Sequence, residues 1–166
     1  MMKDWIIDDR RRVVVKKQDG EFTITIEEPG SETKSVILPA KRWAALIASD
    51  PQIDDSIHTL LAKQYVKYIS HIGGGIFVSV TTGFACVDIR EFYWNKEKQT
   101  TLPTKHGIAL NMQQWTRLKE INLLIKEQFP NLAKIELCSH QTLDELINCF
   151  ECHQFRDDNN LKSFCY

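Results

Sequence analysis

The chain has 166 residues, of which 43% are hydrophobic and 26% charged, and its formal net charge is −1. This composition excludes an intrinsically disordered chain, and 7 Gly and 5 Pro exclude collagen-like and low-complexity classes. The charge is uneven, because residues 1–63, 64–134 and 135–166 carry −1, +4 and −4. Binding to phosphates depends on local charge, so the basic middle segment keeps nucleic-acid binding open.

Several features bear on the compartment. Charges follow Trp5 directly, so no secretory signal is visible. The longest uncharged run, residues 68–87, contains Gly73–Gly75 and alternates small polar with apolar residues, which predicts strands and no membrane contact. Five cysteines without a secretory signal predict reduced thiols. We expect a nuclear protein, or a cytoplasmic one if the source has no nucleus.

The first half of the chain predicts strands followed by a broken helix. A β-rich run at residues 13–15 precedes the turn at Gly20, and residues 21–28 then alternate, with Phe22, Ile24 and Ile26 on one face. Pro39 suits the first turn of a helix that contains Trp43. Pro51 predicts a break near Asp50, after which the apolar pattern resumes over residues 53–61.

The second half repeats this order. Residues 77–80 and 84–91 predict strands around Gly83, and Ala85, Val87 and Ile89 share one face of the second strand. Asn111 and Gln114 form a capping box for a helix whose apolar stripe is Leu118, Ile121 and Ile125. We therefore predict a duplicated unit of four strands and a helix, and expect Trp43 and Trp115 to pack in the core. The expected domains are residues 4–63, 64–129 and 130–166.

The second copy carries the motifs of a known family. These are Val87-Asp88-Ile89-Arg90-Glu91-Phe92-Tyr93-Trp94, then residues 102–111, then Gln114-Trp115. Residues 70–128 thereby resemble the positive cofactor four family, transcriptional coactivators whose core domain binds single-stranded DNA. Residues 4–62 resemble it more weakly. There Glu27 stands in place of the family's arginine, the hairpin loop is shorter, and no aromatic pair follows Glu28.

The resemblance implies an α+β fold of two tandem repeats, each a curved four-stranded antiparallel sheet plus a helix. The two repeats would pair through their helices into an intramolecular pseudo-dimer, so that a monomer would act as a dimer. The implied function is that of a transcriptional coactivator that binds single-stranded DNA without sequence specificity. RNA and proteins of the transcription machinery remain open as further partners.

The resemblance also implies a site. Arg90 would lie on the exposed sheet face beside Phe84, and either Tyr93 or Trp94 would stack on a base. Lys96, Lys98 and Lys105 would contact phosphates from the hairpin loop, and Arg11 and Lys16 would add contacts from the first repeat. The groove would be asymmetric, because acidic residues oppose the charge in the first copy and Gly73–Gly75 replace basic side chains in the second.

Other interpretations remain open. The aromatics could form a lid on the core, the lysines a solvated loop, and the whole protein an interaction module that has lost DNA binding. The sequence contains no nucleophile constellation, phosphate loop or paired-carboxylate motif, so we expect no enzyme and no cofactor.

The acidic segment after Phe129-Pro130 departs from the family pattern. A capping box at residues 142–145 predicts an extra C-terminal helix with one apolar face formed by Leu143, Leu146, Ile147 and Phe150. Docking on the basic sheet as a competitor, binding a protein partner and simple packing all remain open. The segment also holds Cys138, His140, Cys149, Cys152 and His153. Because the predicted helix separates these side chains, we expect no metal site.

Overall fold

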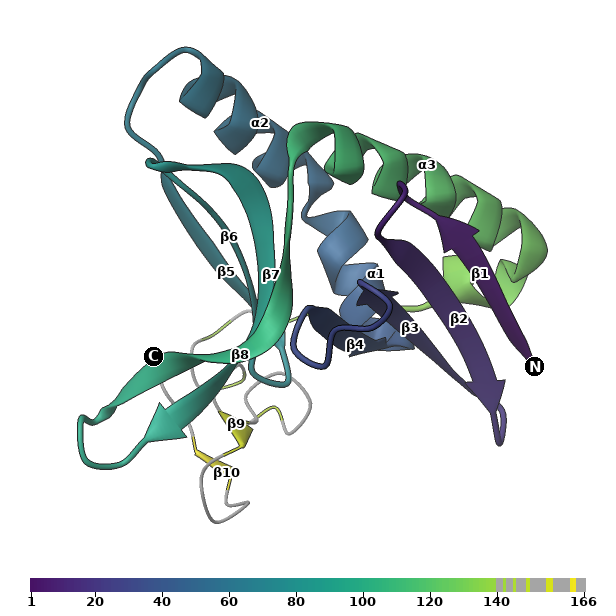
Figure 1. The fold of residues 1–166 in the computed structure, drawn as a ribbon. Helices are drawn as coiled ribbons and strands as arrows, with labels where there is room; N and C mark the ends of the chain where they lie inside the picture. The colour runs from purple at the N-terminus through teal and green to yellow at the C-terminus, as the bar shows by residue number, and fades with distance from the viewer. Residues whose placement is uncertain (140–141, 143–144, 146–148, 150–154, 157–161, 164–166) are drawn as a thin grey trace.

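The computed structural model describes residues 1–139, 142, 145, 149, 155–156 and 162–163. It confirms an α+β fold with two four-stranded antiparallel sheets and three α-helices (Figure 1). No helix in this described part of the chain combines the length and apolar character needed to cross a membrane.

The first sheet has the strand order β1-β2-β3-β4. Its strands are β1 (Met2–Ile6), β2 (Arg12–Gln18), β3 (Glu21–Glu27) and β4 (Ser35–Pro39). Each strand pairs antiparallel with the next one in the chain. The turn between β2 and β3 places Asp19 and Gly20 at positive φ, which explains the glycine there.

The second sheet repeats the same meander with longer strands. They are β5 (Lys67–Gly73), β6 (Ile76–Thr81), β7 (Phe84–Asn95) and β8 (Thr100–Leu110). The uncharged run at residues 68–87 therefore forms strands, as predicted. Two short strands, β9 (Phe155–Arg156) and β10 (Lys162–Ser163), extend this sheet, and β9 pairs with β7 at Tyr93.

The helices confirm the expected break and cap. The first half has α1 (Ala40–Ala48) and α2 (Asp50–Leu61), with Pro51 in the first turn of α2. The second half has a single helix, α3 (Met112–Gln128), followed by the 3₁₀ helix η1 (Pro130–Lys134). Asn111 caps α3 in a capping box with Gln114, which satisfies two of the free backbone N–H groups at the helix start.

One hydrophobic core runs through both halves. It includes the alternating residues Ile24 and Ile26 of β3 and Val87 and Ile89 of β7, all almost completely buried. Ala85 is an exception to the prediction, because it is exposed at the start of β7.

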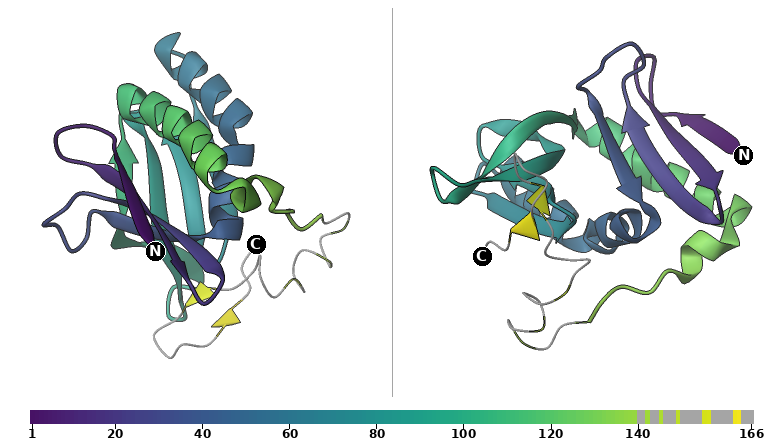
Figure 2. Two further views of the ribbon diagram at one scale, coloured as in Figure 1. Left: turned by 90° about the vertical axis from the view of Figure 1, so that its right-hand side faces the viewer. Right: turned by 90° about the horizontal axis from the view of Figure 1, so that it is seen from below.

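Helices of each half contact the sheet of the other half. The α2 helix packs on β5, β6 and β7 of the other half, whereas α3 contacts β7 and β8 of its own half and also runs beside the first sheet (Figures 1 and 2). At the end of α3, the ring of Phe129 makes edge contacts with Trp5 at 6.4 Å and Phe22 at 5.5 Å between centroids. Neither half therefore covers its own sheet alone.

Both core tryptophans also donate hydrogen bonds to the opposite half. The indole Nε1 of Trp43 donates to Asn122 Oδ1 at 3.2 Å, and that of Trp115 donates to Asp54 Oδ1 at 3.1 Å. Lys119 adds an ion pair to Asp54 at 2.8 Å. The predicted burial of both tryptophans is confirmed, and their polar ends join the two halves.

The residues just before the tryptophans make a second pair of cross-half bonds. Arg42 Nη1 donates to the carbonyl of Ile72 at the end of β5, at 2.7 Å. Gln114 Nε2 donates to Asp8 Oδ2 just after β1, at 2.6 Å. Among the described residues, Arg42, Gln114 and Asn122 are the only buried polar or charged side chains, and all three lie at this junction.

The predicted C-terminal helix lies largely outside the described residues, as do Leu143, Leu146, Ile147 and Phe150. One bond of its expected start is present, because the backbone N–H of Glu145 donates to Thr142 Oγ1 at 3.1 Å.

Candidate nucleic-acid interface

The second sheet has an outer face that points away from the core. Strand alternation places Arg90 on this face, opposite Phe77 of β6 and Gly107 of β8, and Phe77 lies opposite His71 of β5. Ile89, the residue before Arg90, is buried in the core and faces the other way. The predicted orientation of Arg90 therefore agrees with the register of the sheet.

Aromatic rings form a row on this face. The rings of His71 and Phe77 stack with centroids 4.7 Å apart, and Phe77 contacts Phe92 at 4.6 Å. Phe92 was expected only as part of the family motif, and no role was predicted for His71 or Phe77. Period-two alternation was the signal that could have placed Phe77 beside Arg90.

Arg90 is held by several partners within the sheet. Its Nε and Nη2 donate to the two carboxylate oxygens of Asp88 at 3.1 and 3.0 Å, and Nη1 donates to the carbonyls of Thr104 and Lys105 at 3.0 and 3.4 Å. Since a guanidinium has five N–H groups, one N–H of Nη2 remains for a ligand. A phosphate that accepts a further hydrogen bond from Arg90 must compete with Asp88 for the donor.

Gly107 makes room for this arrangement. A Cβ atom at Gly107 would lie 2.8 Å from Arg90 Cζ and 2.9 Å from its Cβ and Cγ. The Arg90 side chain therefore packs across the backbone of β8. Its fixed position explains why a glycine stands opposite the arginine.

Beyond Arg90, β7 and β8 continue as a hairpin that projects from the sheet (Figure 1). The register shifts between Arg90 and Phe92, and we call residues 92–103 the arm. The turn is only residues 96–99, so the prediction that Lys105 belongs to the loop is wrong, and Lys105 is exposed on β8. The extra residues of the second copy went into longer strands, because Phe92–Asn95 pair with Thr100–Pro103.

The other predicted site residues lie in different places. Tyr93 and Trp94 are half-buried on the arm, and Lys96 and Lys98 are exposed at its tip. Phe84 is 68% exposed at the far end of β7. Because a strand rises about 3.3 Å per residue, Phe84 and Trp94 are roughly 30 Å apart along β7, so the structure does not bring them together.

Arg11 lies inside the junction of the two halves and is not part of an open cationic surface. Its side chain is 10% exposed, pairs with Glu28 at 3.5 Å, and donates to the Ala109 carbonyl and to Gln114. These contacts favour a structural role for Arg11. Lys16, by contrast, is exposed on β2 of the first sheet.

The electrostatics of the outer face also involve Cys86, which precedes Asp88 on the same face of β7. Burial is the largest cause that raises the pKa of the Cys86 thiol, and the Asp88 carboxylate adds to it. Arg11 and Arg90 act in the opposite direction. The thiol therefore remains protonated at neutral pH and is a poor nucleophile.

The first sheet has a different outer face. Glu27 takes the place of Arg90, and Arg12 of β2 lies opposite it, with Arg12 Nε 2.8 Å from a Glu27 carboxylate oxygen. Arg12 also pairs with Asp4 at 3.5 Å. Arg12 is therefore held in ion pairs at the position where the second sheet has its aromatic row.

Similarity to known proteins places the chain in a family. A family model described as Transcriptional Coactivator p15 (PC4) matches residues 75–121, which cover β6, β7, β8 and the start of α3. The Arabidopsis thaliana protein "RNA polymerase II transcriptional coactivator KIWI" is 32% identical over 104 residues, 63% of this chain and 82% of the plant protein. The chain belongs to the PC4 family. A Caenorhabditis elegans protein named as an RNA polymerase II transcriptional coactivator is 36% identical to this chain over 52 residues, 31% of this chain and 42% of the nematode protein.

No solved structure matches the chain significantly. Within the described part of this PC4-family chain, no three His, Cys, Asp or Glu side chains lie close enough to hold a metal ion together.

Proposed function

We propose that this protein is a transcriptional coactivator that binds single-stranded DNA, without sequence specificity, on the outer face of its second sheet and along the arm. The observation that carries the proposal is that Arg90 lies opposite Phe77, whose ring contacts Phe92 at 4.6 Å, and that Trp94 occupies the next alternate position of β7. This strand lies inside the segment that matches the family.

The chemistry of these residues suits unpaired nucleotides. Aromatic faces stack on any base, which contributes about 1–3 kcal/mol per base without reading its identity. Lys98 and Lys105 are exposed near the arm and supply charge for phosphates, as does the +4 net charge of residues 64–134. The same contacts tolerate a 2′-hydroxyl, so RNA is a competing ligand in the test.

We also infer that the two halves form an intramolecular pseudo-dimer. This is supported by the repeated order of four strands and helix, and by reciprocal bonds across the junction. Trp43 and Trp115 each donate to the opposite half, and the residues before them each reach the end of the opposite first strand. Such reciprocity is typical of a two-fold interface. The monomer is then the functional unit.

In this pseudo-dimer the halves have different tasks. The first sheet pairs its outer-face cation Arg12 with Glu27 and lacks the aromatic row, so we assign DNA binding to the second sheet. The first half stabilises the second sheet through the contacts at the junction.

The names of the two relatives support a role in transcription by RNA polymerase II. We accordingly propose a nuclear location and contacts with proteins of the transcription machinery.

One observation favours a second candidate function, a protein-interaction module that has lost DNA binding. Asp88 occupies two donors of Arg90, so the guanidinium is already neutralised by its own strand. If this pair persists with DNA present, Arg90 contributes little.

Fluorescence anisotropy with labelled oligonucleotides tests both candidates. We expect single strands to bind more tightly than the matched duplex, with affinity falling steeply as salt rises. Arg90→Ala should weaken binding, whereas Lys126→Ala, which removes an exposed cation of α3, should change it little. No preference for single strands at low salt would refute DNA binding, and tighter binding of matched RNA would redirect the proposal to RNA.

A further inference from the structure

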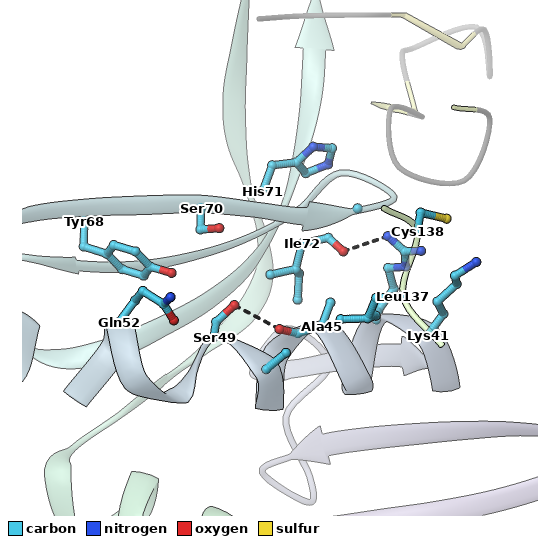
Figure 3. Close-up of a pocket in the computed structure, with 13 residues that line it drawn as sticks. Lys41, Ala45, Ser49, Gln52, Tyr68, Ser70, His71, Ile72, Leu137 and Cys138 are labelled. Carbon is cyan, nitrogen blue, oxygen red and sulfur yellow. Dashed lines mark hydrogen bonds between the residues drawn. The ribbon is translucent and has the colours of Figure 1, made fainter. Parts of the chain in front are cut away.

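We propose that a cavity between α1 and β5 binds a small phosphomonoester whose phosphate group pairs with Arg42. The cavity has a volume of about 450 Å³, and side chains of α1 and of β5 face each other across it (Figure 3). Pockets of roughly 300–1,000 Å³ are the usual size for small-molecule ligands. Its β5 wall includes Tyr68, Ser70 and Ile72, which alternate with His71 of the outer face. The site is therefore separate from the proposed DNA interface.

Arg42 is a buried cation with an incomplete set of partners. It is only 7% exposed, and its one hydrogen bond within the described part of the chain joins Nη1 to the carbonyl oxygen of Ile72 at 2.7 Å. A guanidinium has five N–H groups, so most of its donors remain for a ligand. Its other nitrogens are not sealed inside the protein, as expected for groups that reach the cavity.

No described carboxylate forms an ion pair with Arg42, whose only partner is a neutral carbonyl. A buried charge is unfavourable unless it is paired with an opposite charge. An anion in the cavity would supply that charge.

The second half of the chain offers a comparison. Gln114 and Arg42 each directly precede the core tryptophan of their half, and both side chains reach across the junction. The neutral Gln114 donates to a carboxylate, that of Asp8, at 2.6 Å. The charged Arg42 donates to a carbonyl instead. The side chain that carries the charge is thus the one without a counterion.

The rest of the cavity wall suits a phosphomonoester. Its formally charged side chains within the described residues, Lys41 and Arg42, are both cationic. The planar fork of a guanidinium matches phosphate oxygens, and a positive wall favours a doubly charged phosphate over a carboxylate. The cavity is much larger than a phosphate ion, so its occupant has a body beyond the phosphate. Groups that can bond the hydroxyls of such a body are the side chains of Ser49, Gln52, Tyr68 and Ser70.

Isothermal titration calorimetry of the full-length protein with AMP, inorganic phosphate and adenosine tests the proposal. We expect AMP to bind, inorganic phosphate to bind more weakly, and adenosine, which lacks the phosphate, to show no measurable binding. Arg42→Gln should weaken AMP binding by about 10-fold or more, because it removes the charge and keeps an amide donor near Ile72. Circular dichroism checks that this variant keeps its fold.

A second variant leaves Arg42 and the core intact. Gln52→Glu places a carboxylate on an exposed part of the cavity wall and should lower the affinity for AMP by about 2- to 10-fold. Gln113→Glu is the matched control, because it adds the same charge at an exposed position of α3 that does not line the cavity. It should leave the affinity unchanged.

The cavity and the DNA interface can fail independently. Arg90→Ala should leave AMP binding unchanged, and Arg42→Gln should leave the affinity for single-stranded DNA unchanged. Absence of AMP binding at millimolar concentration would overturn the cavity proposal, as would unchanged AMP binding in Arg42→Gln or equal binding of adenosine. Inorganic phosphate or succinate that binds as tightly as AMP would overturn the assignment to a phosphomonoester.

Discussion

Gly73, a single residue of β5, leaves the space through which the Arg42 side chain of α1 contacts this strand. It has a φ of +103°, and a Cβ atom there would lie 1.3 Å from Arg42 Nη1, the atom that donates to Ile72. Gly73→Ala must therefore displace a buried guanidinium in addition to straining the backbone. We expect it to lower the free energy of unfolding by about 2–4 kcal/mol, as measured by urea denaturation.

Gly30→Ala is the matched control for this prediction. Gly30 has a φ of +87° and nothing within 4 Å of an added Cβ, so only backbone strain remains, about 1 kcal/mol. Equal losses in the two variants would show that the contact with Arg42 contributes nothing.

Titration of one carboxyl group, that of Asp8, makes the free energy of unfolding depend on pH. The hydrogen bond from Gln114 is the largest cause that lowers the pKa of Asp8, and backbone N–H groups of Arg10 and Arg11 add to it, against the effect of burial. A lowered carboxyl pKa contributes stability above the unfolded value, near 3.8, that is lost as pH falls through the folded value. Asp8→Asn should therefore destabilise the protein at neutral pH.

Urea titrations of wild type and Asp8→Asn over a range of pH measure this effect. The difference in stability should shrink as pH falls below about 3.8, because the carboxyl of the unfolded chain then takes up a proton while that of the folded protein does so only at lower pH. A difference that stays constant down to the acid limit would mean that the charge of Asp8 is irrelevant.

Local sequence patterns could predict some of these residue roles and not others. The Asn111 cap and its partner Gln114 are three positions apart, so the capping box was visible in the sequence. The bonds from Arg42 to Ile72 and from Gln114 to Asp8 join residues 30 and 106 positions apart. Such contacts depend on how the elements pack, which no local pattern encodes.

The arm is the element that sequence reasoning described least well. Period-two alternation located Arg90 correctly on β7, but the predicted strand ended at residue 91, whereas β7 continues through the aromatics to Asn95. Residues 100–105 were interpreted as loop, yet they belong to β8. The polar residues and Pro103 of this segment are not typical of a strand. Pairing with β7 holds the segment extended in spite of its composition.

Alternation along the arm favours one of the two candidate stacking residues. Phe92 lies on the outer face, since it contacts Phe77, and strand alternation from Phe92 predicts that Trp94 shares that face while Tyr93 faces the other way. We expect Trp94→Ala to weaken single-stranded DNA binding by about 5- to 150-fold, which corresponds to 1–3 kcal/mol. Tyr93→Ala should change the anisotropy-derived Kd by less than about 3-fold. A larger loss in Tyr93→Ala would reverse the assignment.

At the scale of the whole molecule, each half of the chain has four antiparallel strands followed by helical structure. The sequence could not show that α2 packs on the second sheet while Phe129, at the end of α3, packs on the first. An apolar stripe indicates that one face of a helix is buried, but it does not indicate which sheet the helix packs against. Because each sheet is covered partly by the other half, the core is continuous and the halves should unfold together.

Trp43→Phe tests this coupling, because it removes the donor to Asn122 and leaves a buried amide oxygen without its partner. The cost should be about 1–3 kcal/mol. In native-state hydrogen exchange, the amides of Ile24 in β3 and Ile89 in β7 should lose protection by the same free energy, since both open only by global unfolding. Trp94→Phe on the arm, outside the junction, should leave both amides nearly unchanged. If Ile24 lost protection in Trp43→Phe while Ile89 did not, the two halves would be independent domains, and the reciprocal bonds at their junction would not make one folding unit.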